Sequence, residues 1–176
     1  MLFSGLPFLY YFLPAVLVCY FAAPRKLKNA VLFVFSLIFY GWGEPRYIAL
    51  MIVSIFSGFV FALMIEKKQN KKIGFILMWI SVAVSLSFLL IFKYADFLIE
   101  NVNQLPGVSL PLSKLSLPIG ISFYTFQIIS YTVDVWRGDT KAQRNIISFG
   151  TYVSLFPQLI AGPIVRYTDI ERELQE

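Results

Sequence analysis

The chain has 176 residues, of which 58% are hydrophobic and only 14% are charged. Soluble domains carry about 25% charged residues, so this composition excludes an ordinary soluble fold and predicts an integral membrane protein. The net charge of +5 does not indicate a nucleic-acid partner, because the basic residues lie between apolar segments, as in membrane-protein loops. The chain has no histidine, so it lacks the commonest general base and metal ligand, and we expect no metal site and no bound cofactor.

Four apolar segments open the chain, and their lengths approach the roughly 20 residues that cross a bilayer as a helix. The first, residues 6–23, contains Pro14, which predicts a kinked helix or a separate interfacial segment before the proline. The next three are residues 27–42, 47–65 and 73–92. Residues 93–103 predict a helix that emerges into the interface. We therefore expect residues 1–104 to be scaffold helices, with a loop over the Pro- and Gly-containing residues 105–116.

Residues 117–176 differ from the scaffold because polar side chains interrupt segments that are apolar enough for a membrane. If residues 119–137 are helical, intervals of four and three place a row on one face: Gly120, Tyr124, Gln127, Tyr131 and Asp134. An unpaired polar group in hydrocarbon costs several kcal/mol, so this row must face protein or water. Asp134 either handles substrate, as carboxylates inside membranes often do, or pairs with Arg137 at the interface.

The last apolar segment, residues 146–165, is interrupted by Pro157, Gly162 and Pro163. Such residues free backbone carbonyls that a continuous helix would use, and this break predicts either a cavity lining or a simple kink. Gln158 and Arg166 flank the break. If the segment is re-entrant, residues 166–176 stay on the cytoplasmic side.

We expect an all-α, polytopic transmembrane helix bundle with about six hydrophobic segments, of which the last is kinked or re-entrant. The basic residues predict its topology. Three alternate loops, near residues 26, 69 and 141, hold ten lysines and arginines, whereas the intervening loops hold three. Because basic loops remain in the cytoplasm, these three loops are expected inside and the N-terminus outside. We expect a multi-pass protein of the cell membrane, with the lipid bilayer as its first partner.

Three strings, residues 118–127, 131–138 and 156–166, resemble the membrane-bound O-acyltransferase family, in the branch of alginate O-acetylation and D-alanyl-teichoic acid transfer proteins. The resemblance implies a multi-helix enzyme that carries an acyl group, expected to be acetyl, from a cytoplasmic donor to hydroxyls of an extracytoplasmic cell-surface polysaccharide. The donor implied is acetyl-CoA or an acyl carrier protein, and polysaccharide biosynthetic proteins are further partners.

The resemblance also implies a tunnel through the protein and a catalytic histidine in a later helical segment. Since this chain has no histidine, we expect it to be an N-terminal portion that is inactive alone, and we assign no catalytic residue. The expected tunnel residues are those with polar side chains in the central region: Tyr124, Gln127, Tyr131, Asp134, Gln158 and Arg166.

Other interpretations remain open on the residues alone. The basic residues Arg137, Lys141 and Arg144 either meet the donor or merely follow the positive-inside pattern. An ion- or proton-coupled transporter module would use Asp134, and inverted repeats, none of which is evident, would favour it. A non-catalytic structural membrane subunit is the third possibility.

Overall fold

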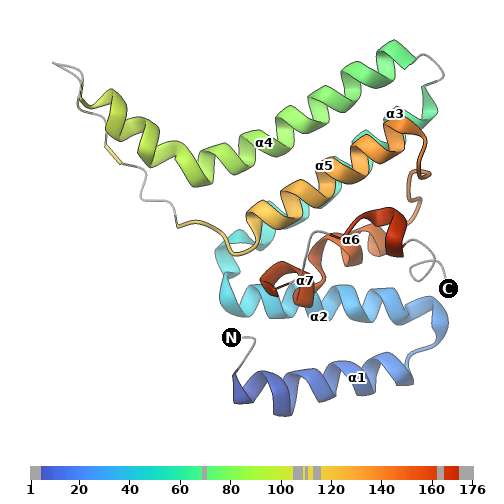
Figure 1. Ribbon diagram of the computed structural model, residues 1–176. Helices are drawn as coiled ribbons and strands as arrows, with labels where there is room; N and C mark the ends of the chain where they lie inside the picture. The colour runs from blue at the N-terminus through green and yellow to red at the C-terminus, as the bar shows by residue number, and fades with distance from the viewer. Residues whose placement is uncertain are drawn as a thin grey trace.

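The described residues of this computed structural model, 5–68, 71–104, 109, 111–112, 116–161 and 165–170, form a helical bundle without β-strands (Figure 1). The all-α expectation is therefore confirmed. In chain order the elements are η1 (Phe8–Phe12), α1 (Leu13–Ala22), η2 (Arg25–Leu27), α2 (Lys28–Gly43), η3 (Pro45–Tyr47), α3 (Ile48–Lys67), α4 (Lys71–Val102), α5 (Ile121–Arg137), α6 (Ile146–Ser154) and α7 (Phe156–Ala161).

The first segment stays helical through Pro14. A proline inside a helix clashes with the carbonyl four residues earlier and removes one hydrogen bond. Here the preceding turn is a π-helix, η1, in which the N–H of Leu13 donates to the oxygen of Phe8. The wider turn accommodates the proline, so residues before it do not form a separate segment.

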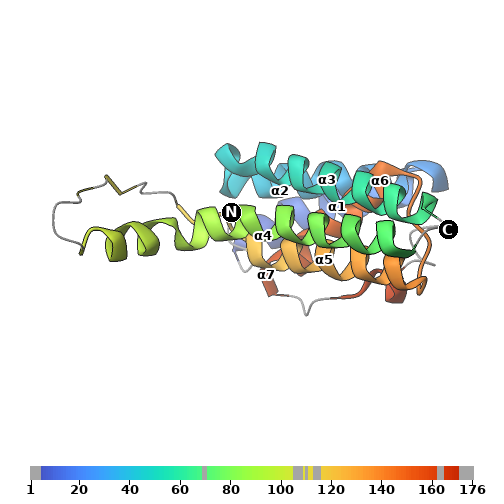
Figure 2. The ribbon, with the colours of Figure 1, turned by 90° about the horizontal axis from the view of Figure 1, so that it is seen from above.

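Two helices of the described chain are long and apolar enough to cross a membrane, residues Pro45–Lys67 and Lys71–Val102. In the most apolar window of the second, α4, only 22% of residues are buried, and side chains such as Ile76 and Trp79 lie on the surface. Such exposed apolar surface suits lipid rather than water. At 32 residues α4 is about 48 Å long and extends well beyond the other helices (Figure 2).

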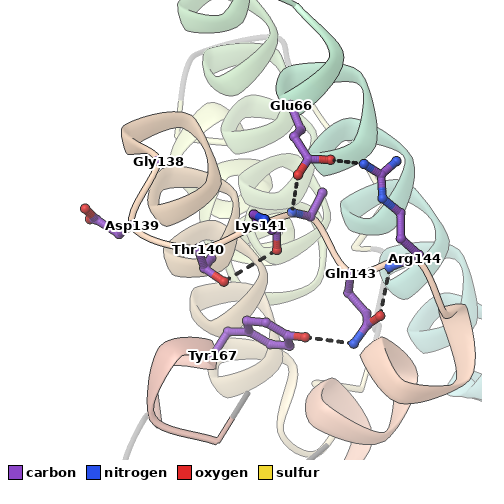
Figure 3. A pocket seen from close by; sticks show the side chains of 9 residues that line it. Glu66, Gly138, Asp139, Thr140, Lys141, Gln143, Arg144 and Tyr167 are labelled. Atoms are coloured by element: carbon purple, nitrogen blue, oxygen red, sulfur yellow. Dashed lines mark hydrogen bonds and ion pairs between the residues drawn. The ribbon is translucent and has the colours of Figure 1, made fainter. Parts of the chain in front are cut away.

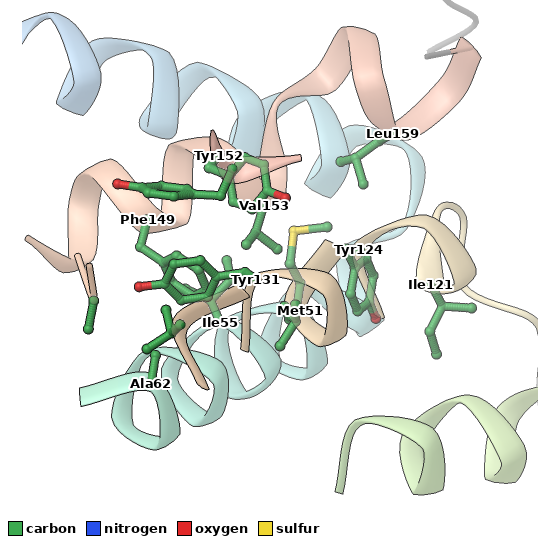
Figure 4. Packing of buried hydrophobic residues seen from close by; sticks show 14 of the residues in the cluster. Met51, Ile55, Ala62, Ile121, Tyr124, Tyr131, Phe149, Tyr152, Val153 and Leu159 are labelled. Atoms are coloured by element: carbon green, nitrogen blue, oxygen red, sulfur yellow. The ribbon is translucent and has the colours of Figure 1, made fainter. Parts of the chain in front are cut away.

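Helix α5 lies at the centre of the bundle and packs against α3, α4, α6 and α7. It approaches α3 closely at Gly58, where an added Cβ would lie 2.6 Å from Cγ2 of Ile128. Around this contact the largest cluster of buried side chains joins α3, α5 and α6, with Tyr131, Phe149 and Tyr152 among its members (Figure 4). The ring centroids of Tyr131 and Phe149 are 4.7 Å apart.

The connections α1–α2, α3–α4 and α5–α6 lie at one end of the bundle (Figure 1). We call it the basic end, because these connections carry ten lysines and arginines: Arg25, Lys26, Lys28, Lys67, Lys68, Lys71, Lys72, Arg137, Lys141 and Arg144. The three basic loops predicted to share one side are therefore together in space.

The final segment breaks earlier than its glycine suggests. Helix α6 ends at Ser154 and α7 starts at Phe156, so Pro157 sits in the first turn of a new helix, where its missing N–H is tolerated. Gly162 and Pro163, the other residues expected at the break, lie outside the described residues.

Beyond the break, the chain returns to the end where α6 begins. Tyr152 on α6 donates its hydroxyl to the carbonyl of Val165 at 2.9 Å. Gln143, just before α6, donates through Nε2 to the hydroxyl of Tyr167 at 2.8 Å. Residues 165–170 therefore lie at the basic end, so the last segment leaves that end and comes back to it.

Candidate functional site

The polar row expected on α5 faces the interior of the bundle. Tyr124, Gln127, Tyr131 and Asp134 are each at most 5% exposed, although their helix carries apolar side chains on its other faces. Helical periodicity places the row on one face, and packing against α3, α6 and α7 buries that face. At the start of the row Gly120 has φ of 74°, a left-handed conformation that favours glycine.

The structure brings two of the expected tunnel residues into direct contact. Gln127 on α5 donates through Nε2 to Oε1 of Gln158 on α7 at 2.9 Å. The carbonyl oxygen Oε1 of Gln127 is buried and has no hydrogen-bond partner among the described residues. The pair therefore joins α7 to the central helix and leaves one strong acceptor available inside the protein.

A second pair of polar groups lies farther from the basic end. The hydroxyls of Tyr124 on α5 and Tyr40 on α2 are buried, and neither has a hydrogen-bond partner within standard distance among the described residues. A buried polar group without a partner costs about 1–3 kcal/mol, so native proteins supply water or a ligand at such places. The two hydroxyls, like Oε1 of Gln127, are thus unsatisfied polar atoms inside the bundle.

Asp134 is buried near the basic end and does not pair with Arg137. Its side chain is 5% exposed, and Oδ2 has no hydrogen-bond partner among the described residues. Neither Arg166 nor Arg137 forms an ion pair with this carboxylate. Arg166 itself is exposed, so it lies at the edge of the site rather than inside it.

Gln143, which the sequence did not single out, connects four parts of this end. Its backbone N–H donates to the hydroxyl of Tyr131 at 2.7 Å, and its amide Nε2 donates to Tyr167. Its Oε1 accepts from the backbone N–H groups of Arg144 and Asn145 at 2.8 and 3.0 Å. Through its backbone and its side chain, this one residue therefore ties α5, the start of α6 and residues 165–170 to the loop between them (Figure 3).

Two adjacent pockets open at the basic end. The larger, of about 570 Å³, is lined by Glu66, residues 138–144 and Tyr167 (Figure 3). The smaller, of about 370 Å³, shares with it the wall formed by Glu66, Gly138, Thr140 and Lys141. Five cationic side chains line the two pockets, against the two carboxylates of Glu66 and Asp139: Lys68, Lys71, Arg137, Lys141 and Arg144.

The charge around the pockets favours an anionic ligand. Clustered cations facing a concave surface raise the local concentration of anions, and Arg guanidinium groups bind phosphates bidentately. Within the described residues no three side chains of His, Cys, Asp or Glu are grouped so that they could hold a metal ion. The expected residues Tyr131 and Asp134 lie on the central helix that ends at these pockets.

Glu66 and Gln143 could not be identified from the sequence. Glu66 stands in a run of lysines at the end of an apolar segment and looks like any solvated loop residue. Its carboxylate accepts from the N–H of Ala142 at 3.2 Å and from Nη2 of Arg144 at 2.6 Å. These partners are 76 and 78 residues away along the chain, and no local pattern signals such pairs.

Comparison with known proteins finds relatives that acetylate polysaccharides. The chain is 38% identical, over 97% of its length, to a probable alginate O-acetylase of Pseudomonas syringae pv. tomato, and 36% identical to that of Pseudomonas aeruginosa; it covers 34% of each. It is 27% identical over its whole length to a peptidoglycan O-acetyltransferase of Helicobacter pylori, of which it covers 39%. The chain thus spans about a third of the length of these relatives. No family model and no solved structure matches it.

Proposed function

We propose that this chain, which belongs to the membrane-bound O-acyltransferase family, forms part of an enzyme that transfers acetyl groups to hydroxyls of a cell-surface polysaccharide. The observation that carries the proposal is its similarity, over 97% of its length, to probable alginate O-acetylases. The enzyme would lie in the cytoplasmic membrane of a bacterium, with the polysaccharide and its biosynthetic proteins outside. Which polymer is acetylated is a property of the whole enzyme.

The basic end is assigned to the cytoplasm. Its connections hold ten basic residues, and cytoplasmic loops of membrane proteins carry such an excess. The start of η1 then lies on the outer side, and the segment of α6, α7 and residues 165–170 is re-entrant, because it returns to the basic end. Several segments are shorter than a full span, among them α2 with 16 residues and α5 with 17, and these would cross with the help of interfacial aromatic residues.

The acyl donor would bind at the two pockets of the basic end. Acetyl-CoA and the prosthetic group of an acyl carrier protein both carry phosphate, and the five cations around the pockets suit that charge. The acyl group would then reach the polar row of α5, whose members nearest the pockets are Asp134 and Tyr131.

The buried polar row would orient the reacting groups. Acyl transfer to an alcohol requires a base for the hydroxyl and donors for the developing oxyanion. The hydroxyls of Tyr40 and Tyr124 and the paired amides of Gln127 and Gln158 can hold a hydroxyl or a carbonyl oxygen by hydrogen bonds. They are positioning groups. With no histidine among these 176 residues, the base would come from another segment or subunit, and the chain alone is expected to be inactive.

An acetyl-transfer assay tests the assignment of the row, using the gene product that carries this chain in membranes with radiolabelled acetyl-CoA. Gln127→Ala and Gln158→Ala are each expected to lower kcat by about 10- to 100-fold, because a reacting group misplaced by about 1 Å costs up to about 100-fold. Gln104→Ala, at an exposed glutamine beyond the end of α4, is the matched control and should leave the rate unchanged. Normal rates in both buried variants would remove the row from the reaction path.

A further inference from the structure

The carboxylate of Glu66 lies in the wall that the two pockets share. Its two oxygens have different partners: Oε1 accepts from the backbone N–H of Ala142, and Oε2 accepts from Nη2 of Arg144 (Figure 3). The first contact anchors the loop between α5 and α6 to the end of α3. The second contact neutralises a carboxylate that would otherwise repel anions entering the pockets.

The two halves of this ion pair differ in exposure. The Glu66 side chain is 24% exposed, whereas the Arg144 side chain is 66% exposed. Exposed ion pairs contribute only about 0.2–1 kcal/mol, since water solvates the separated charges well. Arg144 can therefore leave Glu66 at small cost if another anion at the mouth of the pocket offers a better partner.

A phosphate is a better partner than Glu66, and a carboxylate is not. A phosphate monoester, such as the one on the ribose of coenzyme A, carries more negative charge than a carboxylate and offers three acceptor oxygens to the planar guanidinium fork. A carboxylate ligand would merely exchange one monoanion for another and would leave Glu66 unneutralised beside it. The geometry thus distinguishes the two kinds of anion at the same pocket.

We propose that Glu66 is a specificity-determining residue, which holds Arg144 as an exchangeable counter-ion that only a ligand with a phosphate monoester takes over. This inference rests on the proposed donor site and adds the group that selects among anions there. The loop keeps its place during the exchange, because the Ala142 N–H remains bonded to Oε1. Free acetate, a carboxylate, is excluded by the same residue.

A double-mutant cycle tests the exchange. Coenzyme A, which carries a phosphate monoester, is titrated by calorimetry at low salt into the full chain in lipid nanodiscs. A phosphopantetheine-bearing carrier protein, which carries only a singly charged phosphodiester, is titrated separately and should show no dependence of the Glu66→Gln gain on Arg144. Glu66→Gln keeps an acceptor for the Ala142 N–H but releases Arg144, so binding should tighten about two- to fivefold, the worth of an exposed pair. In an Arg144→Ala background the same substitution should give a smaller gain, because it relieves only the repulsion by the carboxylate and there is no counter-ion to release.

The controls separate this inference from the donor site itself. Asp139→Asn removes an equal charge from the larger pocket and should tighten binding equally with and without Arg144. An equal gain from Glu66→Gln in both backgrounds would overturn the exchange while leaving the donor site in place. Absence of binding by both phosphate ligands would overturn the donor site and the exchange together. Acetate should compete only in the Glu66→Gln variant, and competition in the unmodified chain would contradict the selectivity.

Discussion

Gly120 and Gly138 provide a matched test of how α7 packs on the central helix. Both flank α5 with left-handed backbones, φ of 74° and 87°. Alanine in such a conformation costs about 1–2 kcal/mol at either position. At Gly138 an added Cβ meets nothing within 4 Å, so the conformational cost is the whole effect expected there.

At Gly120 a second cost is added to the first. The new Cβ would lie 2.9 Å from Cδ2 and 3.3 Å from the carbonyl oxygen of Leu159 on α7. The side chain can rotate, but the carbonyl belongs to the backbone of the helix that carries Gln158. Overpacking of this kind costs about 1–3 kcal/mol, so Gly120→Ala should destabilise by about 2–5 kcal/mol and Gly138→Ala by about 1–2 kcal/mol.

Thermal unfolding of the two variants in detergent measures the difference. One kcal/mol shifts the melting temperature by about 2–4 °C in a chain of this size, so Gly120→Ala should melt at least about 2 °C below Gly138→Ala. Equal melting temperatures, or a larger loss at Gly138, would show that α7 does not press on the start of α5. The acetyl-transfer rate should follow the same order, because a shifted α7 lengthens the bond between Gln127 and Gln158.

Two further predictions concern the basic end. Gln143→Ala removes one hydrogen bond to residues 165–170 and two to exposed backbone N–H groups. It should therefore lower the melting temperature by about 2–6 °C. The control variant Gln104→Ala should not change the melting temperature. In a Cys19→Ser background, Lys141→Cys should react with a membrane-impermeant maleimide only from the cytoplasmic side and Arg46→Cys only from outside; the reverse pattern would invert the proposed topology.

The buried polar atoms raise the question of what the bundle holds inside. Tyr40, Tyr124, Gln127 and Asp134 each carry an oxygen without a hydrogen-bond partner in the described chain. In a membrane such groups are more costly than in a soluble core, because water is not nearby to satisfy them. Under the proposed function, substrate hydroxyls would provide the missing partners.

Much of the helical framework could be predicted from local sequence. The start of α5 lies two residues after the expected boundary of the helix, and α2 and α3 lie within about two residues of theirs. Such agreement follows from runs of apolar side chains ended by Pro, Gly or basic residues, which are local signals. The local structure before Pro14 was harder to predict, because a π-helical turn and a kink have the same sequence signature.

The sequence by itself predicted a helical membrane protein, one polar face on α5, and a resemblance to the membrane-bound O-acyltransferase family. Each of these depends on composition, helical period or a contiguous motif. Only the tertiary structure decided that Gln127 meets Gln158, that Asp134 lacks the partner Arg137, and that Arg144 pairs with Glu66. These contacts depend on the packing of helices distant in sequence, where a rotation of one helix changes which side chain meets which partner.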